Sequence, residues 1–190
     1  MLFNSYIFWI FFCFVFSLYW VVPKKFQNMV LLIFSYCFYG LWDWRFLSLI
    51  MISTLVDFFV AKKIVSIPNK KRFYLFCSIM TNLGILGIFK YLGFFIEQLN
   101  TLLFTLGLDA LLPTIDLIIP VGISFYTFQT LSYTIDIYRN KTKPIYSILD
   151  FALYVSFFPQ LVAGPIERSH RLLPQITKPR NYDGTNSQEG

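Results

Sequence analysis

The residue types best suited to chemistry are concentrated in one apolar stretch, Pro120–Arg139. A helix turns about 100° per residue, and over this stretch it has two polar stripes and one apolar face. The first stripe contains Gly122, Tyr126, Gln129, Tyr133 and Asp136, the second Ser124, Thr127, Thr134 and Tyr138, and the apolar face Val121, Phe125, Phe128 and Ile135. Polar side chains in an apolar helix either hydrogen-bond to neighbouring helices or line a path for a polar substrate. Both interpretations stay open, and only the apolar face is expected to meet lipid.

A second apolar stretch is interrupted by polar residues and helix breakers. Gln160 follows Pro159, and the ion-pair candidates Glu167 and Arg168 follow Gly164-Pro165. Half-helix ends inside a membrane often line binding sites. The two stretches together predict a tunnel or substrate path lined by Tyr126, Gln129, Tyr133, Asp136, Gln160 and Arg168.

We predict no catalytic residue and no metal site in this chain. His170 is the only histidine, and it lies between Arg168 and Arg171. Neighbouring cations disfavour a protonated imidazole and weaken it as a base, so His170 is a weak candidate that we do not favour. The three cysteines form no CxxC pair, and one histidine cannot complete a zinc set.

Three charged residues fall inside or near apolar runs, where a charge is costly. We expect Asp57 to lie at the cytoplasmic interface near Lys62-Lys63, and Asp136 to pair with Arg139 three residues later. Lys90 is long enough to reach the headgroup level. A structural role is favoured over a functional one for each of the three.

The composition indicates an all-α, polytopic membrane protein. Hydrophobic residues make up 56% of the 190 residues and charged residues only 14%, too few to cover a soluble domain. The formal charge of +6 comes from short clusters between apolar runs, which is typical of cytoplasmic loops. Nucleic-acid binding is therefore not expected, and the lipid bilayer is the predicted environment.

The apolar runs predict the membrane segments. Tyr6–Val22 is an uncleaved first span with its N-terminus outside, because the first lysine follows it. Two short runs, Val30–Leu41 and Phe46–Ala61, predict a tight helical hairpin around Gly40–Arg45; two shallow helices are the weaker alternative. Tyr74–Ile96 is the next span, and the loop that follows it contains an interfacial helix over Leu99–Leu108.

The last part of the chain differs from a simple series of spans. Leu117–Tyr138 is a span, whereas Ile145–Ile166, broken by Pro159 and Gly164-Pro165, favours a re-entrant segment over a full crossing. The basic clusters at Lys24-Lys25, Lys62–Arg72 and Arg139–Lys143 are then all inside. Residues 1–180 form one membrane region, and residues 181–190 are a polar tail of different composition.

Six segments carry a resemblance to a known family. They are MLFNSYIF (Met1–Phe8), SYCFYGLWDWRFL (Ser35–Leu47), STLVDF (Ser53–Phe58), LGILGIFKYLGFF (Leu83–Phe95), IIPVGISFYTFQTLSYTIDIYR (Ile118–Arg139) and DFALYVSFFPQLVAGPIERS (Asp150–Ser169). In this order they resemble the N-terminal part of bacterial membrane-bound O-acyltransferases of the alginate O-acetyltransferase type. The last two segments are the most specific, and the resemblance covers about residues 1–180.

The resemblance implies a fold and an activity. Family members form a ring of helices around a tunnel in the bacterial cytoplasmic (inner) membrane. A cytoplasmic donor such as acetyl-CoA or an acyl carrier supplies an acyl group, which passes to hydroxyls of an extracytoplasmic polysaccharide such as alginate, or to a partner protein that completes the transfer. The family's catalytic histidine lies in a downstream segment that this chain lacks, and His170 matches a variable position. No catalytic role carries over to Asp57, Lys90, Gln160 or Arg168.

The expected function is therefore that of an O-acyltransferase, present here as an inactive N-terminal piece with no bound cofactor. A truncated gene product, a partial reading frame and a deliberate fragment all fit. Two alternatives from other classes are a transporter or flippase module, suggested by the broken segment near Gly164, and a non-enzymatic membrane subunit.

Overall fold

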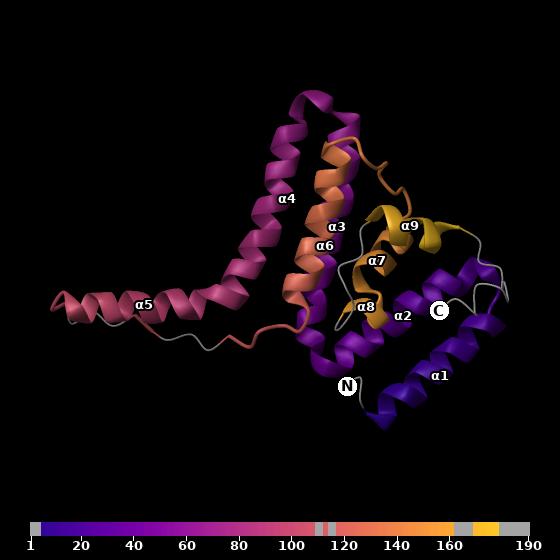
Figure 1. Ribbon diagram of the computed structural model, residues 1–190, viewed down its shortest axis with the longest axis horizontal. Helices are drawn as coiled ribbons and strands as arrows, with labels where there is room; N and C mark the ends of the chain where they lie inside the picture. The colour runs from indigo at the N-terminus through magenta and orange to yellow at the C-terminus, as the bar shows by residue number, and fades with distance from the viewer. Residues whose placement is uncertain (1–4, 109–111, 114–116, 162–168, 179–190) are drawn as a thin grey trace.

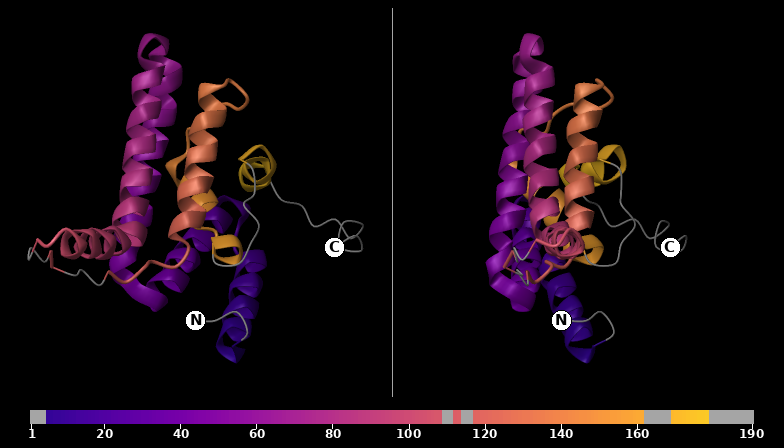
Figure 2. Two further views of the ribbon diagram at one scale, coloured as in Figure 1. Left: turned by 60° about the vertical axis from the view of Figure 1, so that its left-hand side comes forward. Right: turned by 90° about the vertical axis from the view of Figure 1, so that its left-hand side faces the viewer.

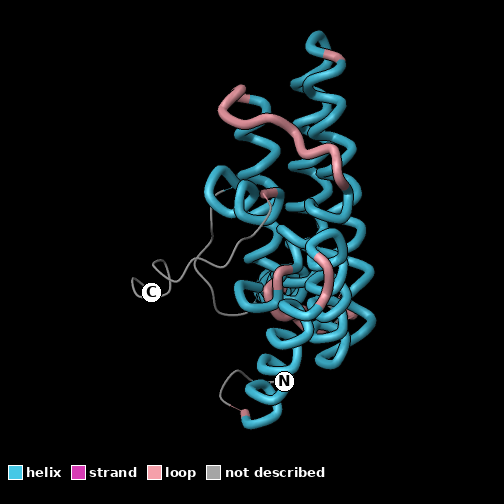
Figure 3. Tube along the Cα trace, turned by 90° about the vertical axis from the view of Figure 1, so that its right-hand side faces the viewer, coloured by secondary structure: helices cyan, strands magenta, loops and turns pink. Residues whose placement is uncertain are grey.

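The described residues of the computed structural model are 5–108, 112–113, 117–161 and 169–178, and every regular element among them is a helix (Figure 3). The α-helices are α1 (Tyr6–Val21), α2 (Lys24–Asp43), α3 (Leu47–Ser66), α4 (Lys71–Leu86), α5 (Leu92–Thr105), α6 (Ile123–Tyr138), α7 (Ile148–Ser156), α8 (Phe158–Leu161) and α9 (Ser169–Thr177). Two continuous helical stretches, Lys24–Ser66 and Pro68–Thr105, are long and apolar enough to cross a membrane. The predicted all-α class is confirmed.

The N-terminal helices begin and end where the sequence provides signals. The Ser5 side chain caps α1 by accepting a hydrogen bond from the Phe8 N–H at 3.3 Å. The helix stops before Pro23, because the residue preceding a proline favours an extended backbone. α1 then packs on α2 through aromatic rings, among them Phe11 and Phe38 with centroids 5.7 Å apart.

Helices α2 and α3 replace the short hairpin predicted from the sequence. Each contains 20 residues, a length of about 30 Å at 1.5 Å per residue, which suits a membrane span. They meet at a single 3₁₀ turn, Trp44–Phe46, capped by the Asp43 carboxylate. Because α2 and α3 diverge from this turn (Figure 1), the prediction of a tight hairpin of short helices is wrong.

The centre of the molecule is a group of three helices. α3, α4 and α6 run side by side in each ribbon view (Figures 1 and 2). Their apolar core includes Ile50, Ala61, Leu86, Ile123 and Ile137, all buried. At one end of this group, Lys62 Nζ donates a hydrogen bond to the Tyr146 carbonyl at 3.3 Å, and Lys71 Nζ lies 4.9 Å from the centre of the Tyr138 ring. Two of the three basic clusters predicted to be inside therefore lie at one end of the bundle.

The span predicted over Tyr74–Ile96 is not one straight helix. A π-helical turn, Gly87–Tyr91, separates α4 from α5, and the chain changes direction there (Figure 1). π-turns widen the helix and commonly bend it. α5 projects away from α3 and α6, with Phe94, Phe95 and Phe104 exposed, so a helix exists where an interfacial one was predicted but begins earlier. Its position at a membrane interface stays a prediction.

The segment after α6 returns on itself. α7 has nine residues, about 14 Å, which is too short to cross a membrane, and the helix breaks at Phe157 before Pro159 as predicted. Asn28 Nδ2 donates to Asp150 Oδ1 at 2.7 Å and to the Ile176 carbonyl at 2.9 Å. The start of α7 and the end of α9 therefore meet beside the start of α2, and the re-entrant path of Ile145–Ile166 stays a prediction because residues 162–166 lie outside the described residues. Gly164-Pro165 and the polar tail lie outside the described residues.

Candidate functional site

Helix α6 is positioned by an unusual first residue. Gly122 caps its N-terminus with a left-handed backbone, φ 75°. A Cβ at Gly122 would lie 2.8 Å from the Leu161 carbonyl oxygen, so only glycine allows α8 to approach this closely. Tyr39 Oη also donates to the Val121 carbonyl at 3.0 Å. These contacts join the start of α6 to α2 and α8.

The first polar stripe of α6 lies inside the protein. Tyr126, Gln129 and Tyr133, which we call the polar face, are all completely buried. Gln129 Nε2 donates to the Tyr154 carbonyl of α7 at 2.8 Å, and Tyr133 Oη accepts from the Ile145 N–H at 2.9 Å. The polar face therefore packs against α7 and the segment preceding it.

Several buried oxygens in this region lack a well-formed hydrogen bond. They are Tyr126 Oη, Gln129 Oε1 and Tyr154 Oη, of which the Gln129 and Tyr154 side chains lie close enough to interact with each other. Buried polar groups nearly always have partners, and an unmet one costs about 1–3 kcal/mol. Water and a polar group of a substrate are both suitable partners for these three oxygens, so the substrate path stays a prediction beside the packing role.

The remaining candidates of the predicted path are dispersed. Gln160 lies on α8 and is buried, whereas Asp136 is only partly buried near the end of α6. Arg168 lies outside the described residues, and for His170 only its place in α9 is described. Within the described part the one ion pair joins Arg45 to Asp43 at 2.6 Å, so the expected pair of Asp136 with Arg139 does not form.

The second polar stripe of α6 contributes to a separate group of residues. This group, the Asp57 cluster, is completely or almost completely buried and consists of Ser53 and Asp57 on α3, Ser78 and Asn82 on α4, and Thr130 and Thr134 on α6. Asp57 accepts hydrogen bonds from Ser78 Oγ and, at 2.7 Å, from Asn82 Nδ2. Asn82 Oδ1 accepts from Ser53 Oγ at 2.6 Å and from Thr130 Oγ1 at 3.3 Å.

The Asp57 cluster corrects one prediction and adds residues that the sequence analysis missed. Asp57 does not lie at an exposed interface, because its side chain is completely enclosed by the three central helices. Ser53 and Asp57, like Ser78 and Asn82, are four residues apart and so share one helix face. That spacing is the signal in the sequence, but it is weak, because polar pairs four residues apart also occur on solvent-exposed helix faces. The satisfied hydrogen bonds here favour interhelical packing.

Lys90 occupies the π-turn and is exposed. Its Nζ donates to Ser124 Oγ in the first turn of α6 at 3.2 Å. The contact joins the bend of the chain to α6. Whether the amine reaches a headgroup level, as predicted, is untested.

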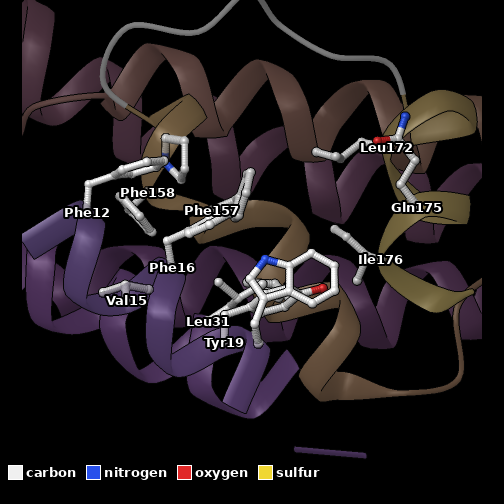
Figure 4. Close-up of a pocket in the computed structure, with 13 residues that line it drawn as sticks. Phe12, Val15, Phe16, Tyr19, Leu31, Phe157, Phe158, Leu172, Gln175 and Ile176 are labelled. Carbon is white, nitrogen blue, oxygen red and sulfur yellow. The ribbon is translucent and has the colours of Figure 1, made fainter. Parts of the chain in front are cut away.

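A separate apolar groove lies beside α7. It has a volume of about 320 Å³ and is lined by Phe12, Val15, Phe16, Tyr19, Trp20, Leu31, Leu153, Phe157, Phe158, Pro159, Leu172, Gln175 and Ile176. Figure 4 shows these side chains converging from α1, α2 and the α7–α9 region. The volume is at the lower end of the range of about 300–1,000 Å³ that is usual for ligand pockets.

The chemistry available at the polar face is recognition rather than proton transfer. Phenol and amide groups can bind and orient a hydroxyl or carbonyl group, but they are weak bases. In the described residues no group of three or more histidine, cysteine, aspartate or glutamate side chains could hold a metal ion. The face is thus suited to lining a path and not to completing a catalytic centre by itself.

The fold and this interior define a class: an all-α protein with apolar, membrane-length helices and a polar, hydroxyl-rich centre. Within that class the chain is a relative of bacterial O-acetyltransferases, as the sequence motifs predicted. It is 36% identical over 180 residues to the "Probable alginate O-acetylase AlgI" of Pseudomonas aeruginosa, a match that covers 93% of this chain. The protein of the same name from Azotobacter vinelandii is 35% identical over 181 residues, again 93% of this chain.

A relative named for a different acceptor is nearly as similar. The "Peptidoglycan O-acetyltransferase" of Helicobacter pylori is 33% identical over 182 residues, which covers 82% of this chain. The matches cover 34–36% of these three relatives, so the chain spans about a third of their length. No family model and no solved structure matches the chain.

Proposed function

We propose that this chain contributes the first helices of a bacterial membrane-bound O-acetyltransferase that transfers an acetyl group to hydroxyls of an extracytoplasmic polysaccharide such as alginate. The observation that carries the proposal is 36% identity to an alginate O-acetylase over 93% of the chain. The buried oxygens of Tyr126, Gln129 and Tyr154 support it, because they provide hydrogen-bonding positions inside the bundle.

The proposal includes a donor and a location. An acyl donor such as acetyl-CoA or an acyl carrier supplies the acetyl group from the cytoplasm, and extracytoplasmic partner proteins complete the transfer to the polymer. The chain lies in the cytoplasmic membrane with its N-terminus outside. The polar face of α6 then lines part of the route along which the reacting groups meet.

The proposal is tested by deleting the gene in the bacterium that carries it. Ester-linked acetate, released by mild alkali, is measured separately on extracellular polysaccharide and on peptidoglycan. We expect the polysaccharide acetate to be lost and a plasmid copy to restore it. Unchanged acetate on both polymers would refute the proposal, whereas loss from peptidoglycan alone would change only the acceptor.

Variants of the plasmid copy test the substrate path. Tyr126→Phe and Gln129→Leu should restore about a tenth of the acetate while the protein accumulates normally, since a lost hydrogen bond to a bound group is worth about 1.5 kcal/mol, which is about tenfold in binding. The matched control is Phe128→Leu, on the same helix but 49% exposed, which should restore full acetylation. Full activity of both variants would show that the polar face serves only to pack α6 against α7.

A further inference from the structure

The Asp57 cluster places a carboxyl group in the interior of the central helix group. Asp57 lies near the middle of α3, and its side chain is completely buried. A charge at such a position is costly unless an opposite charge is close. Among the described residues the only ion pair joins Arg45 to Asp43. Lys62, the next basic residue on α3, places its Nζ 4.0 Å from the centre of the Phe58 ring. No basic side chain of the described part therefore pairs with Asp57.

The hydrogen bonds around Asp57 fit an ionised carboxylate. Asn82 Nδ2 donates to Asp57 Oδ2 at 2.7 Å and to the Ser78 carbonyl at 3.0 Å, so the orientation of the amide is fixed. Ser78 Oγ donates to the other carboxylate oxygen, Oδ1. Both oxygens of Asp57 thus accept, as those of a carboxylate do. The donors are neutral, so they solvate the negative charge without balancing it.

Neutral oxygens from three helices surround this carboxylate. Ser53 Oγ donates to Asn82 Oδ1 at 2.6 Å, and Thr134 Oγ1 donates to the Thr130 carbonyl at 2.7 Å. The hydroxyls of the cluster thus give their protons to Asp57, to Asn82 or to a backbone carbonyl, which leaves lone pairs on the hydroxyl oxygens. Oxygen ligands of this kind are those that hard cations prefer.

A further oxygen on the same side of α6 lacks a hydrogen bond. Thr127 precedes Thr130 by three residues and Thr134 by seven, so the three threonines share one helix face. Thr127 Oγ1 is buried and has no hydrogen-bond partner. Because buried oxygens nearly always have a partner, this face of α6 is suited to a polar or charged ligand beyond the hydrogen bonds already formed.

The ligand types select the charge of the cation. One carboxylate balances one positive charge, and Mg²⁺ would keep several waters, which a completely buried site does not favour. The cluster contains no cysteine or histidine, the ligands that transition metals prefer, so it differs from the metal sites considered in the sequence. A small monovalent cation is therefore the best match.

We propose that the Asp57 cluster binds one Na⁺ ion between α3, α4 and α6. Asp57 supplies the negative charge, and Asn82 Oδ1 and the hydroxyl oxygens supply neutral ligands. The ion joins the three central helices in addition to their hydrogen bonds. The site is independent of the proposed acetyl transfer, because it rests on the second polar stripe of α6 and not on the polar face.

Thermal unfolding of the purified chain in detergent tests the proposal. Sodium chloride replaces choline chloride at constant ionic strength, so that only the cation changes. A sodium concentration about 100 times the dissociation constant favours the folded state by about 100-fold, which should raise the melting temperature by about 5–10 °C. Potassium chloride should produce a smaller rise. Equal melting temperatures in sodium, potassium and choline chloride would overturn the proposal.

Variants of the cluster then locate the ion. Asp57→Asn removes the charge at nearly constant shape and should abolish the sodium-dependent rise. Thr134→Val keeps the carboxylate and removes one neutral ligand, so about tenfold more sodium should be needed for the same rise. This second variant provides the test if Asp57→Asn does not fold.

The matched control is Asp136→Asn, which neutralises a partly buried carboxylate on α6 and should keep the full sodium response. If Asp57→Asn, or Thr134→Val in its place, responds to sodium as the unaltered chain does, the ion binds elsewhere and the proposed site is refuted. The same conclusion follows if Asp136→Asn alone loses the response. Cellular acetylation is not part of this readout, so a failure here leaves the proposed function unaffected.

Discussion

At the scale of single residues, buried polar groups on the two sides of α6 differ in whether they have hydrogen-bond partners. The Asp57 side chain of α3 lies on one side of α6, and Tyr126 lies on the other. Asp57 is completely buried, yet its carboxylate accepts hydrogen bonds from Ser78 and Asn82, which offset part of its desolvation. Tyr126 is buried to the same degree but its hydroxyl has no partner. The first arrangement stabilises the bundle, whereas the second is costly and is expected to serve a bound group.

The Asp57 cluster predicts a stability effect. Asp57→Ala leaves Ser78 and Asn82 with unmet polar groups, so the free energy of unfolding in detergent should fall by about 1–3 kcal/mol. Thermal unfolding followed by circular dichroism measures it. The matched control is Asp136→Ala on α6, a carboxylate without an ion pair to Arg139, which should change stability by less than about 0.5 kcal/mol. Equal effects of the two variants would contradict a structural role for the cluster.

The tyrosines of the polar face predict opposite results for one chemical change. Tyr126→Phe removes a hydroxyl that has no partner and should leave the free energy of unfolding unchanged or higher. Tyr133→Phe removes the acceptor of the Ile145 N–H and should lower it by about 1 kcal/mol. A clear loss of stability in Tyr126→Phe would show that its hydroxyl has a partner in the folded protein.

At the scale of elements, the positions of α6 and α8 depend on one glycine. Gly122 and Gly107 both have positive φ angles, 75° and 72°, but a Cβ at Gly107 meets nothing within 4 Å, whereas at Gly122 it meets the Leu161 carbonyl oxygen. The left-handed backbone alone costs a non-glycine residue about 1–2 kcal/mol. The close contact adds to this cost only at Gly122. Comparing substitutions at the two glycines therefore distinguishes the cost of backbone strain from the cost of the close contact.

We therefore expect Gly122→Ala to destabilise the protein by more than about 2 kcal/mol and Gly107→Ala by only about 1 kcal/mol. Denaturant titration of both variants in the same detergent provides the comparison. Gly122→Ala should also displace α8 and thereby lower the polysaccharide acetate restored in cells. If the two variants lose the same stability, the approach of α8 to α6 is looser than the 2.8 Å contact implies.

At the scale of the whole molecule, the basic clusters predict an orientation. In a background without cysteines, Lys70→Cys should react with a membrane-impermeant maleimide only after spheroplasts are opened, because Lys62–Arg72 is expected inside. Gln98→Cys, on exposed α5, is the control and should react in intact spheroplasts. Ready labelling of Lys70→Cys from outside would reverse the predicted topology.

The isolated chain also has a predicted activity. Reconstituted in membranes with labelled acetyl-CoA and alginate, it should transfer no label above the level of empty membranes. Acyl transfer to a hydroxyl needs a base within about 2.6–3.2 Å, and no described side chain makes such a hydrogen bond to Tyr126 Oη. Label on the polymer that disappears in His170→Ala would show that His170 is the base after all.

The sequence by itself determined the class, the family relationship and the residues on each face of α6. These follow from local properties, namely the fraction of apolar residues, the 100° helical period and six sequence motifs. The break before Pro159 was likewise readable, because proline removes a helical hydrogen bond wherever it occurs.

Only the tertiary structure decided what each face contacts. It enclosed Asp57 between helices that are remote in sequence, left Asp136 and Arg139 unpaired, and bent the predicted Tyr74–Ile96 span at Gly87–Tyr91. It also brought Lys178 beside Lys24 and Lys25. The physical reason is that burial, hydrogen-bond partners and local charge depend on packing between distant segments, which helical periodicity cannot specify.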